Sequence, residues 1–203
     1  LELAPWRAQR AQLPPFAKPP SRTIAPLLMQ NLVAISAMGA NRAGLIEPIV
    51  RAIRECGCAI AESRMSVMGD RFAMMVLLGG AWDAIAKIEN MLPRLAQELD
   101  ITITSQRAAS RQPAHNLMPY AVEVIAVEQI GIVHQIAQFF SRRDINIEDM
   151  YSGNYAAAHT GTPMFSLHMT ISIPTNISIA GMRSDFMDFC DQHNLDAIME
   201  PVK

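Results

Sequence analysis

The segment GLIEPIVRAIRECGCAIAESRM, residues 44–65, recurs in its apolar pattern as GIVHQIAQFFSRRDINIEDMYS, residues 131–152. The two copies are 87 residues apart and align without a gap. The aligned pairs are Gly44 with Gly131, Leu45 with Ile132, Ile46 with Val133, Ile49 with Ile136, and Ile60 with Ile147. The two copies have few identical residues, but they keep the same spacing of apolar residues. This indicates a duplicated domain of about 80 residues, a normal size for a small domain.

Apolar spacing assigns the secondary structure of the first copy. Apolar residues three and four positions apart predict helices, and Gly69-Asp70 between two apolar runs predicts a tight hairpin. Pro93, inside the second helix, predicts either a kink or a misplaced boundary. The expected elements are a strand at 32–38, a helix at 44–56, strands at 58–67 and 71–78, a helix at 81–99 and a strand at 101–107.

The second copy repeats this order, with a longer hairpin. Its expected elements are a strand at 120–127, a helix at 131–142, strands at 145–153 and 164–173, a helix at 177–192 and a strand at 195–202. The order βαββαβ predicts an α+β chain of two tandem ferredoxin-like domains, each an antiparallel sheet with both helices on one face. The exposed sheet edges and the strand-to-helix turns are where such a unit would meet a ligand or another copy.

Composition sets the expected domain boundaries. Six prolines and no helical periodicity predict a disordered extension at 1–30, followed by domains at 31–108 and 119–203 and a linker at 109–118. Because Met29 stands just before the first strand, residues 1–28 are interpreted as an upstream extension rather than part of the natural product.

Charge and cysteine content limit the function classes. The chain has 17 basic and 19 acidic side chains, and residues 1–30 hold four of the former and one of the latter, which leaves a net of −5 for the remainder. Such an acidic body is a poor autonomous nucleic-acid binder. Three cysteines, an odd number, argue against a disulfide framework and favour a reducing cytosol. No apolar run approaches the roughly 20 residues that span a bilayer.

The stretch GANRAGLI, residues 39–46, has the glycine spacing of a phosphate-binding loop. However, Leu45 and Ile46 stand where such a loop needs Lys and then Ser or Thr, so phosphate chemistry is excluded. What remains is a glycine turn before a helix N-terminus, a geometry that favours any anion, including a carboxylate. Alternatively, Gly44 only permits a close turn.

Several motifs of the first copy together resemble the ACT domain, and within it the glycine cleavage system transcriptional repressor family. They are G-x-N-R-x-G-L, C-G-C-x-I-x-x-S-R, M-G-D-x-F and L-L-G-G-x-W, and they lie between residues 39 and 82. The second copy resembles the family more loosely, through INIEDMYSG and GTPMFSLHMTISIP.

This resemblance implies a cytoplasmic, non-enzymatic regulator that senses an amino acid. Members of the family would repress the glycine cleavage operon by contacting a LysR-type DNA-binding activator, and glycine would weaken that repression. Direct nucleic-acid contact, a membrane and a cofactor are not expected. The alternative is a stand-alone ACT sensor of another amino acid that acts on an enzyme or a different partner.

An amino-acid ligand needs donors for its carboxylate and acceptors for its ammonium group. The N–H groups around Gly44 and Leu45 are the expected donors, with Arg42 as a further candidate. The expected acceptors are Asn41, Glu62 and Ser63. The corresponding candidates in the second copy are Glu128, Gly131, Ile132 and Asp149.

The first turn departs from the family, which usually carries Asp and then Arg-Pro-Gly. Asn41 replaces the acid and Ala43 the proline, and the second copy lacks the arginine. An amide oxygen can accept a hydrogen bond but carries no charge, so the departure leaves the identity of the ligand open.

Residues for catalysis or metal binding are not evident in the sequence. The five histidines are scattered, and no local Ser-Asp-His or Cys-His set is visible. Cys56 and Cys58 have no second Cys/His pair at a metal-binding spacing, so they are interpreted as structural thiols. An enzyme with an unrecognised spatial site is the third alternative.

Overall fold

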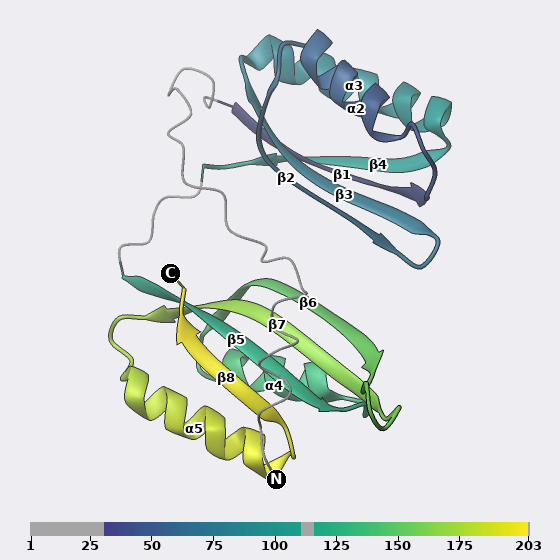
Figure 1. Ribbon diagram of the computed structural model, residues 1–203. Helices are drawn as coiled ribbons and strands as arrows, with labels where there is room; N and C mark the ends of the chain where they lie inside the picture. The colour runs from purple at the N-terminus through teal and green to yellow at the C-terminus, as the bar shows by residue number, and fades with distance from the viewer. Residues whose placement is uncertain (1–30, 111–115, 203) are drawn as a thin grey trace. The chain divides into compact units, whose positions relative to one another are not determined.

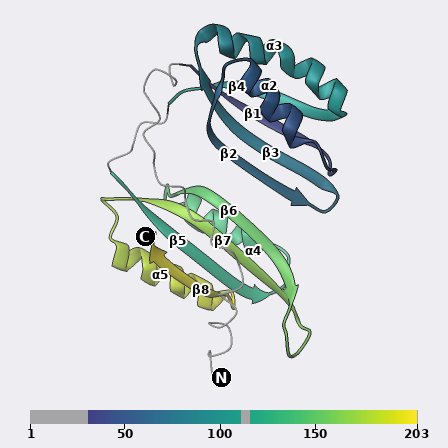
Figure 2. The ribbon, with the colours of Figure 1, turned by 45° about the horizontal axis from the view of Figure 1, so that its top comes forward.

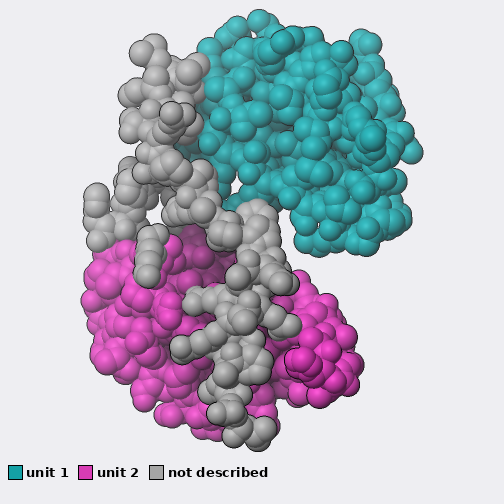
Figure 3. Space-filling model, viewed as in Figure 1, with its two compact units in different colours: residues 1–111 teal, residues 112–203 magenta. Residues whose placement is uncertain are grey.

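The computed structural model describes residues 31–110 and 116–202. The chain divides into two compact units, residues 1–111 and 112–203 (Figure 3). The expected extension at residues 1–30 and residues 111–115 of the expected linker lie outside the described residues. Each unit is described by itself.

Unit 1 is a four-stranded antiparallel sheet with two helices on one face (Figure 1). The strand order is β2-β3-β1-β4. Its elements are β1 (Asn31–Ala40), α2 (Ile46–Glu55), β2 (Ala59–Met68), β3 (Arg71–Gly80), α3 (Trp82–Leu99) and β4 (Ile101–Ala108).

Unit 2 repeats this architecture, with strand order β6-β7-β5-β8. Its elements are β5 (Leu117–Val127), α4 (Ile132–Ser141), β6 (Asn146–Ala156), β7 (Pro163–Pro174), α5 (Ile179–Gln192) and β8 (Asp196–Pro201). The register of β2 shifts between Ile60 and Glu62, and that of β6 shifts at the corresponding place, between Ile147 and Asp149. The predicted tandem βαββαβ fold is confirmed, and the two units also share the position of this irregularity.

The helices of each unit cover one face of its sheet (Figure 2). A separate hydrophobic core lies between sheet and helices in each unit. In unit 1, alternate residues of β1 (Val33, Ile35 and Ala37) are buried, as the period of a strand requires. They pack against helix residues that are three or four positions apart, such as Ile85 and Ile88, which are fully buried. Most apolar residues at helical spacing therefore form the core, but Ile46, Val50 and Trp82, which share that spacing, are exposed.

Phenylalanine rings dominate the core of unit 2. Phe186 of α5 is fully buried, and its ring centroid lies 5.1 Å from that of Phe140 and 5.3 Å from that of Phe139. Aromatic pairs at these separations add attraction to their large buried area. The rings thus fix α4 and α5 on the sheet.

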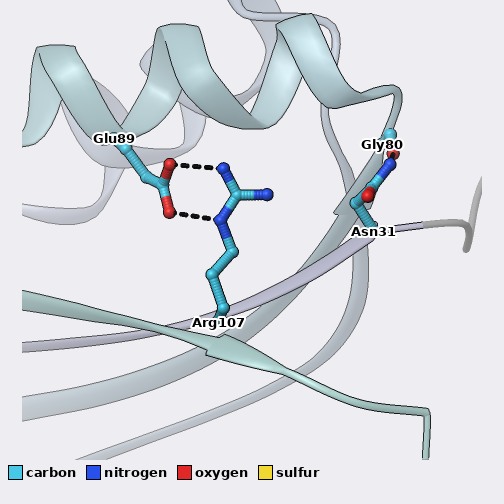
Figure 4. Close-up of polar contacts among 4 residues, drawn as sticks. All are labelled: Asn31, Gly80, Glu89 and Arg107. Atoms are coloured by element: carbon cyan, nitrogen blue, oxygen red, sulfur yellow. Dashed lines mark hydrogen bonds and ion pairs between the residues drawn. The ribbon is translucent and has the colours of Figure 1, made fainter.

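Polar contacts fasten the last strand of unit 1 to its second helix. Arg107 of β4 donates two hydrogen bonds to the carboxylate of Glu89 on α3, at 2.7 and 2.6 Å (Figure 4).

A side-chain contact also joins the start of β1 to the end of β3. The Asn31 side chain donates a hydrogen bond to the Gly80 carbonyl at 3.4 Å (Figure 4).

Helix α3 runs without interruption through Pro93. Pro93 is exposed, so its ring faces solvent and the carbonyl that loses a donor can bond water. A misplaced helix boundary, one of the two expectations for Pro93, is therefore wrong.

Strand β5 begins at Leu117, inside the segment expected as a linker, because its first residues pair with the end of β7.

Candidate functional site

The turn between β1 and α2 is held against the β2–β3 hairpin. The backbone N–H of Asn41, directly after β1, donates to the carbonyl of Asp70 in the hairpin turn at 2.8 Å. The side chains of Asn41 and Arg42 are exposed. A backbone bond to a neighbouring turn fixes the position of the segment while its side chains remain accessible.

Gly44 and Leu45 give this turn its shape. Gly44 has φ = +86°, in the left-handed region, and a Cβ at this position would meet no atom within 4 Å. Leu45 is 3% exposed and anchors the start of α2 in the core. No side chain caps α2. The N–H groups at the start of this helix therefore have no side-chain partner, and the helix dipole favours an anion there, but Pro48 has no N–H and Glu47 adds negative charge to the first turn.

Arg42 has a structural partner that the sequence did not suggest. Its Nη2 atom donates to the carbonyl of Leu99 at 2.6 Å, at the C-terminal end of α3. The guanidinium satisfies one of the carbonyls that a helix end leaves unpaired. Arg42 thus ties the turn to α3 and brings positive charge to its surroundings, whereas the nearby Asp70 carboxylate is paired with Arg71 at 3.4 Å.

Glu62 and Ser63 are not brought next to this turn within unit 1. Glu62 pairs with Leu77 on β3, and Leu77 pairs with Ala34 on β1. Ala34 is six residues before the end of β1, which places Glu62 about 20 Å along the strands from the turn. Glu62 instead lies 3.4 Å from Arg64 on its own strand. Their role as acceptors at the turn is therefore not supported by the placement in a single unit.

The corresponding turn of unit 2 has the same backbone and the opposite charge. The N–H of Glu128 donates to the carbonyl of Pro163 at 3.0 Å, as Asn41 does to Asp70. Gly131 has φ = +99°, and Ile132 is buried at the start of α4. The Glu128 carboxylate accepts a hydrogen bond from the Asn154 side chain at 2.5 Å. The Glu128 carboxylate is thus already engaged by Asn154, and Gln129 stands where unit 1 has Arg42, so this turn is less suited to an amino-acid ligand than the turn of unit 1.

Asp149 belongs to a polar cluster on the sheet face opposite the helices of unit 2. The Tyr151 ring stacks on the His168 ring with centroids 4.6 Å apart, and His168 Nδ1 lies 3.8 Å from a Glu123 carboxylate oxygen. Burial raises the pKa of the Tyr151 hydroxyl, and the charges of Glu123 and Asp149 raise it further. The histidines are thus less isolated than the sequence indicated, since one of them has an acidic and an aromatic neighbour.

A groove of about 410 Å³ lies between α4 and α5 of unit 2. Phe139 and Phe189 are among its lining residues. Arg143 lies 3.8 Å above the Phe139 ring centroid and 3.5 Å from the Asp185 carboxylate. Neither candidate turn contributes to this groove, so it is separate from the expected ligand site.

The three cysteines are free thiols with suppressed reactivity. Burial raises the pKa of Cys56 and Cys58, and raises the pKa of Cys190 to about 12. Because the thiolate is the nucleophile and the metal ligand, these thiols are poorly suited to either task. Within residues 31–110 and 116–202, no group of three or more His, Cys, Asp or Glu side chains could hold a metal ion. No helix in these ranges is long and apolar enough to cross a membrane.

Comparison with known proteins gives the same assignment as the sequence motifs. Residues 31–106 match the family model of the ACT domain. The chain is 28% identical over 176 residues to the "Glycine cleavage system transcriptional repressor" of Escherichia coli (strain K12), across 87% of this chain and 93% of that protein. The protein of the same name from Shigella flexneri matches equally. The resemblance predicted from the motifs is therefore confirmed.

Two solved structures share the tandem fold over nearly their whole length. A crystal structure of a candidate glycine cleavage system transcriptional repressor has a TM-score of 0.64 and 21% identity, and covers 85% of this chain and 98% of its own. An unknown protein from Galdieria sulphuraria has a TM-score of 0.69 and 20% identity, with coverage of 85% and 99%. At these identities the likeness establishes the fold alone.

Proposed function

We propose that this protein is an amino-acid-responsive regulator of transcription that binds glycine at the β1–α2 turn of unit 1. It acts by contacting a LysR-type DNA-binding activator, and glycine weakens that contact. The observation that carries the ligand assignment is the exposed turn at Asn41–Leu45. This turn combines a left-handed glycine, an uncapped helix start and a nearby guanidinium, all of which favour a carboxylate.

Contact through a partner follows from the charge of the chain. The body outside residues 1–30 has the net charge of −5 derived above, and nucleic-acid binding depends on clustered Lys and Arg. The named relatives are transcriptional repressors, which is consistent with an effect on transcription. A protein partner would then supply the DNA contact. To weaken the contact, glycine needs to bind the partner-free form only about tenfold more tightly than the partner-bound form, which is a coupling free energy of about 1.4 kcal/mol.

Thermal unfolding of the full chain with a panel of amino acids tests the ligand assignment. Glycine at 100 times its dissociation constant is expected to add about 2.7 kcal/mol and to raise Tm by several degrees. A shift with a different amino acid alone would favour the sensor of another ligand, for which Asn41 in place of an acid is the supporting feature. No shift with any amino acid would contradict a ligand site in the isolated protein.

The electrophoretic mobility of operator DNA tests whether the chain acts through a DNA-binding partner. The chain alone is expected to leave glycine cleavage operator DNA unshifted. Added to the complex of the LysR-type activator with that DNA, it is expected to change the mobility of the complex, and glycine is expected to reverse the change. Direct binding of the DNA by the chain would contradict the proposed route.

Restoring a carboxylate at the turn is expected to tighten glycine binding. Asn41→Asp replaces a neutral acceptor by a charged one for the ligand ammonium group, a difference of about 1 kcal/mol, or about fivefold in affinity. Isothermal titration calorimetry measures it. Asn90→Asp is the matched control, because Asn90 is an exposed residue of α3 and gains the same charge away from the turn. Equal effects of the two substitutions would contradict the assignment of Asn41.

A further inference from the structure

The sheet face of unit 1 that the helices leave uncovered has a charge-free centre. Residues that pair across strands point to the same side, and Ser36 pairs with both Met75 and Thr104. By the same register Arg71, at the end of β3, also points outward and is charged. The nine outward positions nearer the middle of the three strands are uncharged. They are Ala73, Met75 and Leu77 on β3; Ala34, Ser36 and Met38 on β1; and Thr102, Thr104 and Gln106 on β4.

Large and small side chains alternate across this face. Met75 is 63% exposed and Met38 is 57% exposed, whereas Ala34 and Ala73, on the same face, have short side chains. Methionine side chains are flexible and polarizable, and they fill irregular gaps readily in an opposing surface. A flat sheet with apolar projections is suited to packing against a second sheet face, about 10 Å away.

The equivalent face of unit 2 shows that this composition is not imposed by the fold. Where unit 1 has Ser36 and Met75, unit 2 has Glu123 and His168 at the same register position. Asp149, Asp196 and Glu200 are also outward positions there, by their pairing with Thr170, Ile125 and Ala121. Two copies of that face would bring carboxylates together, which is costly. Two copies of the uncharged centre of the unit 1 face would desolvate no charge, because Glu62, which occupies the place of Asp149, lies with Arg64 on the edge strand β2.

We propose that the outer face of the β2-β3-β1-β4 sheet, defined by the nine positions above, is the interface of a homodimer in which two copies pack the same face about a two-fold axis. None of these nine residues could form an ion pair with a charged partner. A second copy, in contrast, presents the same uncharged, largely apolar residues. Isologous pairing uses one patch twice, as is usual for two-fold dimers.

The size of the face indicates a weak dimer. Four strands about 4.8 Å apart and eight to ten residues long cover about 600 Å² per copy, an area that includes the charged Glu62, Arg64 and Arg71 around the nine central positions. Stable protein interfaces bury about 800 Å² per partner, so this one is at the lower end of the specific range. We therefore expect a dissociation constant in the micromolar range. The charges of Glu62 and Arg64 lie on β2, at the rim of the face, where they stay in contact with water.

Sedimentation velocity of the full chain over a range of micromolar concentrations tests the dimer. The wild type is expected to shift from monomer to dimer as concentration rises. Met75→Lys places an ammonium group in each half of the interface and is expected to raise the dissociation constant on the order of a hundredfold. Met38→Lys, at the other exposed methionine of the face, is expected to act in the same direction.

The matched control is Val50→Lys, which adds the same charge to unit 1 on the solvent side of α2, where Val50 is 37% exposed. It is expected to leave the dimer unchanged. A wild type that is monomeric throughout overturns the proposal, as does a dimer that Met75→Lys leaves intact. If the wild type is monomeric and Met75→Lys abolishes binding of the transcription activator instead, the face belongs to that partner, and the homodimer is likewise overturned. None of these outcomes depends on glycine binding.

Discussion

Replacing Phe186 by alanine is expected to lower the free energy of unfolding of unit 2 by about 3–5 kcal/mol. The ring is fully buried, and it lies within 5.3 Å of the rings of both Phe139 and Phe140. The substitution removes its transfer free energy and leaves a cavity that these large, close-packed neighbours can fill only in part. A typical domain is stable by only 5–15 kcal/mol, so this loss is large.

Hydrogen exchange measured by mass spectrometry along a urea series reports the two units separately. Protection of unit 2 peptides is expected to fall at lower urea, whereas peptides of unit 1 keep their protection because the two buried clusters share no residue. Phe189→Ala is the matched control. Phe189 is only partly buried and contacts His193 at the edge of the core, so its loss is expected to be clearly smaller. Equal losses for the two variants would contradict the central position of Phe186.

Local pattern was sufficient for the order and type of every described element. Apolar residues recur at every second position in β1 and at every third or fourth position in α3, which distinguished the strand from the helix. Because the two copies keep the same spacing, the assignment of each element in one copy supported that of its counterpart in the other. Strand ends were less predictable, because they depend on the partner strand. Strand β5 continues back to Leu117 since Pro174 at the end of β7 is there to pair with it.

The candidate site was predictable only as far as it is local. Gly44 and Gly131 have the positive φ that a glycine turn before a helix suggested. Sequence proximity to a motif does not give register across a sheet, which is why Glu62 was grouped with a turn that lies far along the strands. The contact of Arg42 with the Leu99 carbonyl joins residues 57 positions apart, and no local signal marks it.

The charge contrast between the two outer sheet faces also required the structure. Glu123 and Ser36 are both polar residues inside apolar strands, and only the pairing register shows that they occupy the same place in the two units. Once they are aligned in this way, the duplicated domains differ in chemistry at two sites. Unit 1 has the positive turn and a sheet face with an uncharged centre, whereas unit 2 has the anionic turn and the acidic face.

Replacing Gly44 by valine is expected to weaken the glycine-induced rise in Tm while the protein remains folded. A β-branched residue at φ = +86° is strained by about 1–3 kcal/mol, and no surrounding atom would clash with it directly. The strain is relieved by rotating the backbone of the turn, which redirects the N–H groups at the start of α2. Since these groups are the proposed carboxylate donors, the glycine concentration for half-maximal effect should rise at least about tenfold, a loss of about 1.4 kcal/mol.

Gly57→Val separates loss of the site from loss of stability. Gly57 has φ = +79° just beyond the other end of α2, and a Cβ there would meet only the Ala84 side chain, at 4.0 Å. The two substitutions therefore introduce the same residue into nearly the same backbone conformation of one unit, and both should lower Tm by a similar amount. Glycine should still raise the Tm of Gly57→Val. If both variants respond to glycine like the wild type, the ligand does not bind at this turn, and if both lose the response, general destabilisation explains the loss.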